Sequence, residues 1–143
     1  MARDERGQVT VMIIGFAAIL LLAIAVVVDA SAAYLQKSGL DTVADGAALA
    51  GTEALDLQAG YGHGFDDPAL SRRLVEQAVA QYLGDTQARD RFPGLDYTLS
   101  VTGNRVVVRV KAPLRLPLRV PGAAEAAPIA ATGTAELDPR TGP

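Results

Sequence analysis

The sequence contains no cysteine, and its 143 residues include a single histidine. The absence of cysteine excludes disulfides, thiolate nucleophiles and thiolate metal sites, and it is compatible with export from the cell. A formal net charge of −3 creates no strong field that would attract nucleic acid or an acidic substrate. The length allows one domain with a modest hydrophobic core.

Groups that could perform catalysis are also scarce. Covalent catalysis needs a nucleophile, a base and an orienting group, yet His63 is the only imidazole and no serine lies in a G-x-S-x-G setting. The glycine-rich stretch Gly60–Gly64 lacks the preceding strand and following helix of a phosphate-binding loop. His63 lies near Asp66 and Asp67, but an isolated loop histidine is usually a surface residue. We therefore predict no enzymatic activity, no cofactor, no metal site and no small-molecule substrate.

Charge is missing altogether from the twenty residues between Val9 and Val28. A helix of this length spans about 30 Å, the thickness of a bilayer's hydrocarbon core. The block also lacks the polar stripe that a soluble core helix keeps. We predict a transmembrane helix over residues 9–28, with the lipid bilayer as its partner.

The orientation follows from the basic residues on either side. Arg3 and Arg6 precede the apolar block, and Lys37 is the nearest cation after it. The positive-inside rule therefore predicts a cytoplasmic N-terminus, residues 1–8, and an extracytoplasmic remainder from Asp29 onward.

A cleaved signal peptide is the alternative to an anchor. Ala30-Ser31-Ala32 has the small-x-small pattern that signal peptidase accepts. A signal peptide's apolar region usually runs about 7–15 residues, however, and twenty favours an anchor. Cleavage would release a secreted domain that begins near Ala33.

Helix-compatible sequence continues beyond the apolar block, because proline is absent from Val9 to Leu55. One helix over this range would be roughly 70 Å long. Residues 29–58 are predicted to form its amphipathic extension. The apolar stripe comprises Leu40, Val43, Ala44, Ala47, Ala50, Gly51 and Ala54, and another face carries Asp41, Asp45, Thr52 and Asp56. A glycine costs about 1 kcal/mol in a helix interior, so the sequence leaves open whether the helix continues through Gly39 or kinks or breaks near Ser38-Gly39.

The exported part, residues 59–143, is predicted to hold a second short helix and a small antiparallel sheet. Asp67-Pro68 is typical of a helix start, and the helix should end near Gly84, followed by a charged loop over Asp85–Gly94. Its apolar stripe is Leu70, Leu74, Val75, Ala78, Val79, Tyr82 and Leu83. The chain from residue 138 onward is predicted to be a frayed tail.

Alternating hydrophobicity predicts three strands in the last third of the chain. Tyr97, Leu99 and Val101 lie on the first strand, and Gly103-Asn104 is a plausible two-residue hairpin turn. Alternation then continues from Arg105 to Val120, and Ile129–Leu137 is a third strand. The prolines of the long middle segment, Pro113 and Pro117, lack donors toward the same neighbour, which predicts that one side of this strand is a sheet edge.

Charged residues suggest a surface for interaction. The basic face of the middle strand comprises Arg105, Arg109, Lys111, Arg115 and Arg119. Asp41 and Asp45 offer an acidic patch on the long helix. These charges are either a solvated face or a surface that meets anionic lipid or a partner protein.

The N-terminal third carries a recognisable pattern. Arg6-Gly7 precedes the apolar block, Asp29 closes it, and residues 40–50 read LDTVADGAALA. This arrangement resembles the N-terminal module of the TadG-like proteins of the Tad (tight adherence, Flp) pilus-assembly family, which are related to the TadE-like pseudopilins. The matching positions are Gly7, Asp29, Asp45, Ala47, Ala48 and Leu49.

The resemblance implies a pilin-like, single-pass membrane protein that helps build or anchor an adhesive pilus, with other pilus-assembly or pseudopilin subunits as partners. Two departures are visible. Met12 stands where prepilin-type sequences carry glutamate, and Asp29–Ala33 lacks the second serine of the D-x-S-x-S metal motif found in long family members. The alternative function is a secreted or surface-anchored domain that binds an anionic cell-envelope polymer or lipid through the basic strand.

Overall fold

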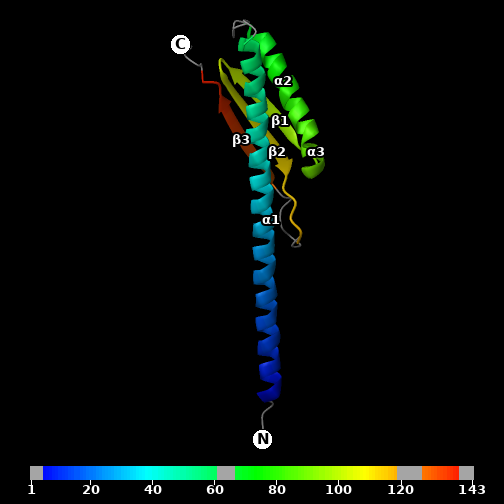
Figure 1. Ribbon diagram of the computed structural model, residues 1–143. Coiled ribbons are helices and arrows are strands. Elements are labelled where there is room, and N and C mark those ends of the chain that lie inside the picture. The colour runs from blue at the N-terminus through cyan, green and yellow to red at the C-terminus, as the bar shows by residue number, and fades with distance from the viewer. Residues whose placement is uncertain (1–4, 61–66, 119–126, 139–143) are drawn as a thin grey trace.

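The computed structural model describes residues 5–60, 67–118 and 127–138, and it confirms the predicted α+β fold. The elements in chain order are α1 (Glu5–Gly60), α2 (Pro68–Asp85), α3 (Ala88–Arg91), β1 (Asp96–Thr102), β2 (Arg105–Pro113) and β3 (Pro128–Glu136). The N-terminal half of α1 projects far beyond the rest of the molecule, and its C-terminal half packs against the other elements (Figure 1). We call residues Gly7–Val28 of α1 the stem.

The long helix α1 runs for 56 residues through Gly39, which resolves the question left open by the sequence in favour of a continuous helix. A Cβ atom at this position would lie 3.0 Å from Cζ of Phe92, which shows that an aromatic ring packs directly on the glycine. An ion pair between Lys37 and Asp41 also bridges this turn. Packing and the i, i+4 pair together offset the roughly 1 kcal/mol that a glycine costs in a helix.

Within the described residues, three antiparallel strands form a sheet in the order β1-β2-β3. The predicted turn at Gly103-Asn104 is confirmed, and Gly103 has a φ of 59°, a left-handed conformation that glycine adopts readily. The predicted edge is wrong, because β2 is the central strand. Pro113 is its last residue and lies opposite Pro128, so the missing donors fall where the ladder ends.

The strand predicted from Arg105 to Val120 is therefore too long. It ends at Pro113, and the chain from Leu114 to Leu118 has no regular structure. Two backbone amides of this segment are instead bound by side chains of α1. Proline at positions 113 and 117 removes donors that a continued ladder would need.

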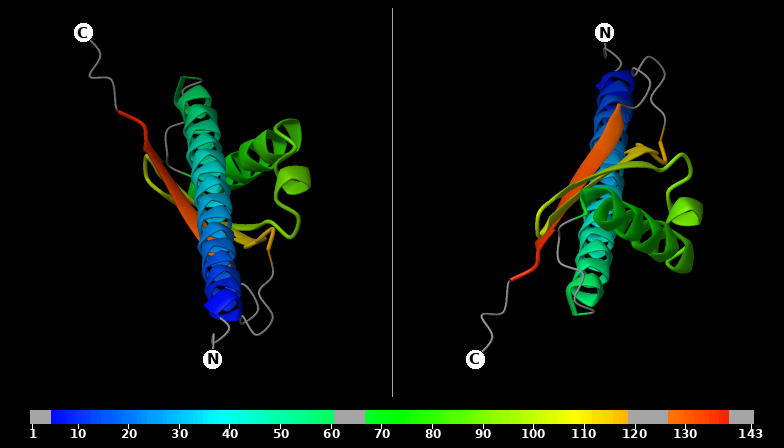
Figure 2. Two further views of the ribbon diagram at one scale, coloured as in Figure 1. Left: turned by 90° about the horizontal axis from the view of Figure 1, so that it is seen from below. Right: turned by 90° about the horizontal axis from the view of Figure 1, so that it is seen from above.

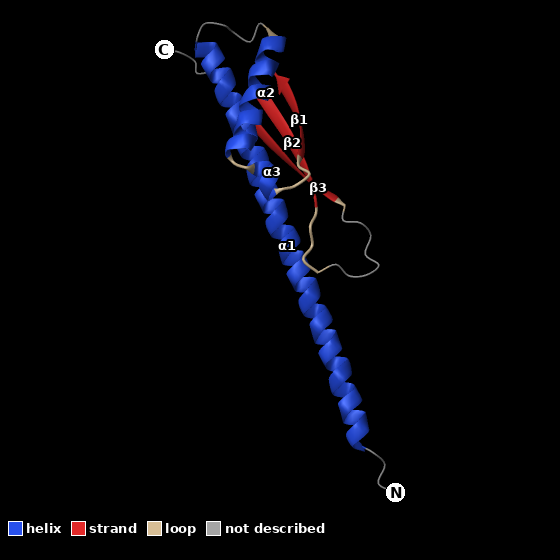
Figure 3. Cartoon of the chain, turned by 90° about the vertical axis from the view of Figure 1, so that its right-hand side faces the viewer, coloured by secondary structure: helices blue, strands red, loops and turns tan. Residues whose placement is uncertain are grey.

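The core lies between one face of the sheet and the helices α1 and α2, which cover that face (Figure 2). Side chains of β2 alternate as predicted, with Val106, Val108, Val110 and Ala112 buried. The buried apolar residues of α1 are Leu40, Val43, Ala44, Ala47, Ala48 and Leu55. Figure 3 shows this two-layer arrangement from the side.

The second helix begins as predicted. The Asp67 carboxylate caps α2 by accepting hydrogen bonds from the amides of Ala69 (2.9 Å) and Leu70 (3.1 Å). Val75, Val79 and Leu83 of the expected stripe are buried. The charged loop expected after this helix contains the short helix α3, because burial of Ala88 and Phe92 attaches this turn to the core.

Thr52 is another correction, since it is 5% exposed rather than part of the polar face. Its hydroxyl donates to the carbonyl of Leu49 at 2.8 Å within α1. A hydroxyl satisfied by its own helix can be buried at low cost. The GYGHG stretch falls largely outside the described residues, as do His63, Asp66 and the tail from residue 139.

Small residues let the elements approach one another closely. A Cβ atom at Gly133 of β3 would lie 2.1 Å from the backbone oxygen of Ala44. At Gly46 of α1, a Cβ atom would lie 1.9 Å from the hydroxyl of Tyr82 on α2. The backbone of α1 therefore rests directly on β3, and a tyrosine of α2 crosses α1 at a glycine.

Replacing Gly133 by alanine tests the first of these contacts. The added methyl group would collide with backbone atoms of α1, which cannot move aside by changing a rotamer. We expect Gly133→Ala to lower the free energy of unfolding by about 1–3 kcal/mol or more. The measurement is urea unfolding of the full chain in detergent micelles, followed by circular dichroism.

Gly84→Ala is the matched control, because a Cβ atom at this exposed helical position meets no atom within 4 Å. This variant should be neutral or slightly stabilising, since alanine favours helix over glycine by about 1 kcal/mol. Equal stability of the two variants would contradict the close contact between α1 and β3.

Candidate functional site

The stem is the most unusual surface of the molecule. Its large apolar side chains are exposed, from 41% at Val28 to 71% at Val11 and Met12. Among the described residues, α1 is the one helix long and apolar enough to cross a membrane. An apolar surface of this size on a water-soluble monomer would cause association. The stem is thus suited to anchoring the chain in a membrane.

Asp29 stands directly after the stem and contacts a segment far away in sequence. Its Oδ1 accepts a hydrogen bond from the backbone amide of Leu118 at 3.0 Å. Two turns further along α1, Gln36 binds the same segment twice. Its Nε2 donates to the carbonyl of Pro113 at 3.3 Å, and its Oε1 accepts from the amide of Arg115 at 2.9 Å. The chain after β2 is thereby tied to α1 at two levels.

The motif DGAAL, residues 45–49, divides between the core and the surface. Ala47 and Ala48 are fully buried, and the hydroxyl of Tyr82 occupies the space that a side chain at Gly46 would need. Asp45 and Leu49, by contrast, point outward, and Leu49 is 56% exposed. The small residues of the motif thus serve packing, while its aspartate and leucine remain available to a partner.

Asp45 and Leu49 belong to a longer exposed row on α1. We call this row the outer stripe, and it comprises Asp45, Leu49, Glu53, Asp56 and Leu57. All five are exposed, and Leu57 is 64% exposed. In the part of the chain that the structure describes, no ion pair engages the three acids of this stripe. Asp41 differs from them, because it pairs with Lys37.

The second charged surface lies on the side of the sheet that faces away from the helices. Arg109 and Lys111 are exposed there, and no described residue forms an ion pair with either. Thr98 and Thr132 flank Arg109 across the strands, and Asp96 is opposite Lys111. This outer sheet face is therefore largely hydrophilic, and it is basic along β2.

Other basic residues predicted for this face have different surroundings. Arg105 forms an ion pair of 2.8 Å with Glu136 on β3. Hydrogen bonding and charge from Arg105, together with a hydrogen bond from Asn104, lower the pKa of the Glu136 carboxyl. Arg115 lies beyond the end of β2 and is exposed, and Arg119 falls outside the described residues. Arg109 and Lys111 are thus the exposed cations of β2 that form no ion pair with a described residue.

The acidic and basic residues predicted as an interaction face do not come together. The outer stripe lies on the side of α1 opposite its buried residues, so it points away from the sheet. The outer sheet face is on the other side of the molecule. The domain therefore presents one acidic and one basic surface, back to back.

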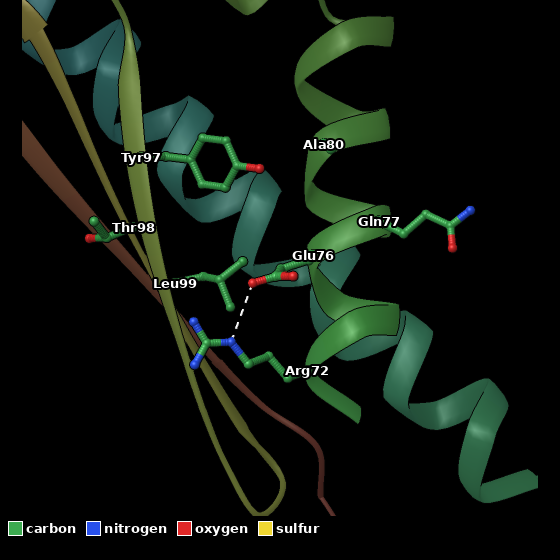
Figure 4. Close-up of a pocket in the computed structure, with 7 residues that line it drawn as sticks. All are labelled: Arg72, Glu76, Gln77, Ala80, Tyr97, Thr98 and Leu99. Carbon is green, nitrogen blue, oxygen red and sulfur yellow. Dashed lines mark hydrogen bonds and ion pairs between the residues drawn. The ribbon is translucent and has the colours of Figure 1, made fainter. Parts of the chain in front are cut away.

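A groove of about 590 Å³ lies between α2 and β1, lined by Arg72, Glu76, Gln77, Ala80, Tyr97, Thr98 and Leu99 (Figure 4). Its charged groups, Arg72 and Glu76, pair with each other at 3.3 Å along α2. The lining includes no histidine, cysteine or lysine. Across residues 5–60, 67–118 and 127–138, no three His, Cys, Asp or Glu side chains cluster as metal ligands would.

Comparison with known proteins supports the resemblance seen in the sequence. Residues 7–59 match the family model described as "Putative Flp pilus-assembly TadE/G-like". No curated protein and no solved structure matches the chain. The matched segment covers the stem, Asp29, the small-residue motif and the whole outer stripe. The resemblance to the Tad/Flp pilus-assembly family is therefore confirmed over this segment, residues 7–59.

Proposed function

We propose that the chain is a non-enzymatic, pseudopilin-like component of a Tad/Flp-type pilus assembly or secretion system. It crosses the cell membrane once, with the N-terminus in the cytoplasm and the folded domain outside. One observation carries the proposal: an exposed apolar stem continues as a single helix into a small folded domain, within the segment that matches the family.

The mechanism we propose is association. The stem would sit in the bilayer among other membrane helices, and the domain would contact neighbouring subunits through the outer stripe and the outer sheet face. These surfaces carry opposite charge and lie on opposite sides, so one copy can engage two neighbours at once. Contacts between unlike surfaces are heterologous, and they generate rings or open filaments.

An alternative proposal is a secreted or surface-anchored domain that binds an anionic cell-envelope polymer or lipid. Arg109 and Lys111 favour it, because both are exposed with no ion-pair partner among the described residues. Such binding would weaken strongly with salt. The intact mass of the mature protein separates the assembly role from the secreted form of the alternative, because signal-peptide cleavage would leave a chain that begins near Ala33.

A genetic complementation experiment tests the assembly role. Deleting the gene in the native host should abolish pili, and the wild-type chain should restore them. Ile19→Arg should fail to restore them, because an arginine near the middle of a membrane helix costs about 2.5–3.5 kcal/mol of insertion free energy. Ile19→Leu is the matched control. Normal pili without the gene would exclude the assembly role.

The proposed topology can be tested by labelling, since the chain has no natural cysteine. Ala2→Cys and Thr98→Cys are compared in intact cells with a membrane-impermeant maleimide. We expect labelling at Thr98→Cys, which is on the exposed sheet face, and none at Ala2→Cys until the membrane is opened. The reverse pattern would show the opposite orientation.

Charge reversal tests the two association surfaces. Asp45→Lys with Glu53→Lys should reduce cross-linking between copies in membranes, because like charges would then face each other. Arg109→Glu with Lys111→Glu should do the same. Combining all four changes should restore cross-linking if the two surfaces contact each other.

Arg72→Glu with Glu76→Arg is the control, since it reverses an exposed pair outside both surfaces. Cross-linking that is unchanged in both charge-reversed variants would rule out these surfaces as the site of association.

A further inference from the structure

The segment Leu114–Leu118 runs along α1 toward the stem. Gln36 binds the backbone at its upper end, at Pro113 and Arg115, and Asp29 binds its lower end at Leu118. Seven residues of helix separate Gln36 from Asp29, about 10 Å along the axis. Figures 1 and 3 show the chain after β2 descending beside α1 in this direction. We call these five residues the descending segment.

The proposed location of the stem puts the lower end of this segment at the membrane border. The hydrocarbon core of a bilayer is about 30 Å thick and the whole bilayer about 40–45 Å, so each headgroup layer measures roughly 5–8 Å. The twenty apolar residues from Val9 to Val28 would fill the core, and Asp29 would follow at its edge. Leu118 is hydrogen-bonded to Asp29, so it would lie at the depth of the lipid headgroups.

The side chains within about 10 Å of this border have the composition of a membrane interface. Leu118 is 44% exposed, and Tyr34 and Leu35 on the next turns of α1 are 73% and 68% exposed. Arg115 is exposed at the upper end of the segment, and its long side chain can extend back toward the border. Tyrosine is enriched at membrane surfaces, and arginine binds lipid phosphate while its stem contacts apolar groups.

Asp29 has a chemical reason to hold this segment. A carboxylate at the border of the hydrocarbon core loses part of its hydration, which is costly unless a donor replaces the lost water. The amide of Leu118 supplies such a donor at 3.0 Å. The same hydrogen bond brings a leucine side chain to the lipid surface, 89 residues away from Asp29 in sequence.

We propose that the descending segment docks on the bilayer surface, with Leu118 in the headgroup layer and Arg115 on lipid phosphate. This inference rests on the proposed membrane location of the stem. A single helix leaves the domain free to rotate about the helix axis and to rise or sink. A second contact, offset from that axis, sets both the height and the rotation of the domain.

Tryptophan fluorescence tests the proposal, because the natural chain contains no tryptophan. Single substitutions Leu118→Trp, Ile24→Trp and Leu57→Trp are made in the full chain. Each variant is reconstituted into phosphatidylcholine vesicles with and without brominated acyl chains, which quench tryptophan on contact. Ile24 reports on the stem, and Leu57 lies 28 residues beyond Asp29, about 42 Å along the helix.

We expect loss of fluorescence at Ile24→Trp and Leu118→Trp, and none at Leu57→Trp. Quenching at position 24 without quenching at position 118 would overturn the docking proposal and leave the proposed function standing. Absence of quenching at both positions would overturn both. The positions of the three probes thus separate the two failures.

Two further variants test the named residues in the Leu118→Trp background. Asp29→Ala should reduce quenching by releasing the segment, and Asp29→Asn, which keeps an acceptor oxygen, should largely preserve it. Unchanged quenching in Asp29→Ala would overturn the role of Asp29. Adding phosphatidylglycerol should increase quenching when Arg115 is present but not in Arg115→Gln, and an equal response would exclude Arg115 as the phosphate contact.

Discussion

The whole domain depends on the close packing of the C-terminal half of α1 against β3 and α2. The backbone at Ala44 rests on Gly133, and Ala47 and Ala48 are buried without any exposed surface. This half of α1 supplies a large part of the core, and the valines of β2 supply much of the rest. A small sheet with one short helix could not bury enough apolar surface on its own. The helix that carries the membrane stem is therefore also the centre of the fold.

Periodicity was enough to predict most of the elements. The alternation of Val106, Val108 and Val110 identified the buried face of β2, and Asp67-Pro68 identified the start of α2. Local rules failed where a distant contact decided the outcome. Gly39 stays helical because Phe92 packs on it. The strand that ends at Pro113 can be central because this proline lies opposite Pro128, at the end of the ladder, where its missing donor interrupts no further pairing.

The site was harder to predict than the fold. Asp45, Arg109 and Lys111 are exposed, but their distribution over two opposite surfaces depends on how α1 lies on the sheet. Arg105 and Arg109 could not be distinguished by sequence. In the structure Arg105 forms an ion pair with Glu136 on β3, and this contact is what separates it from Arg109. The contact of Asp29 with Leu118 joins residues 89 positions apart, and neither residue carries a local signal for it.

The motif of residues 45–49 combines two independent requirements. Its alanines and glycine are limited by volume, because neighbouring backbone and Tyr82 occupy the space that larger side chains would need. Its aspartate and leucine are exposed, so their size is not limited by neighbouring atoms, and both are accessible to a partner. Substitutions at the buried positions of this motif should thus affect folding, whereas substitutions at Asp45 and Leu49 would affect recognition in the proposed assembly role.

Because α1 is unbroken, a tilt of the stem also moves the folded domain at the other end of the helix. From Asp29 to Gly60 the helix extends about 46 Å beyond the apolar stem. If the stem tilts by about 20°, an average value for membrane helices, the far end moves sideways by roughly 16 Å. Small rearrangements of the stem would thus become displacements of the folded domain as large as the spacing of several β-strands. A movement of the stem can reach the far end of the domain through one continuous helix.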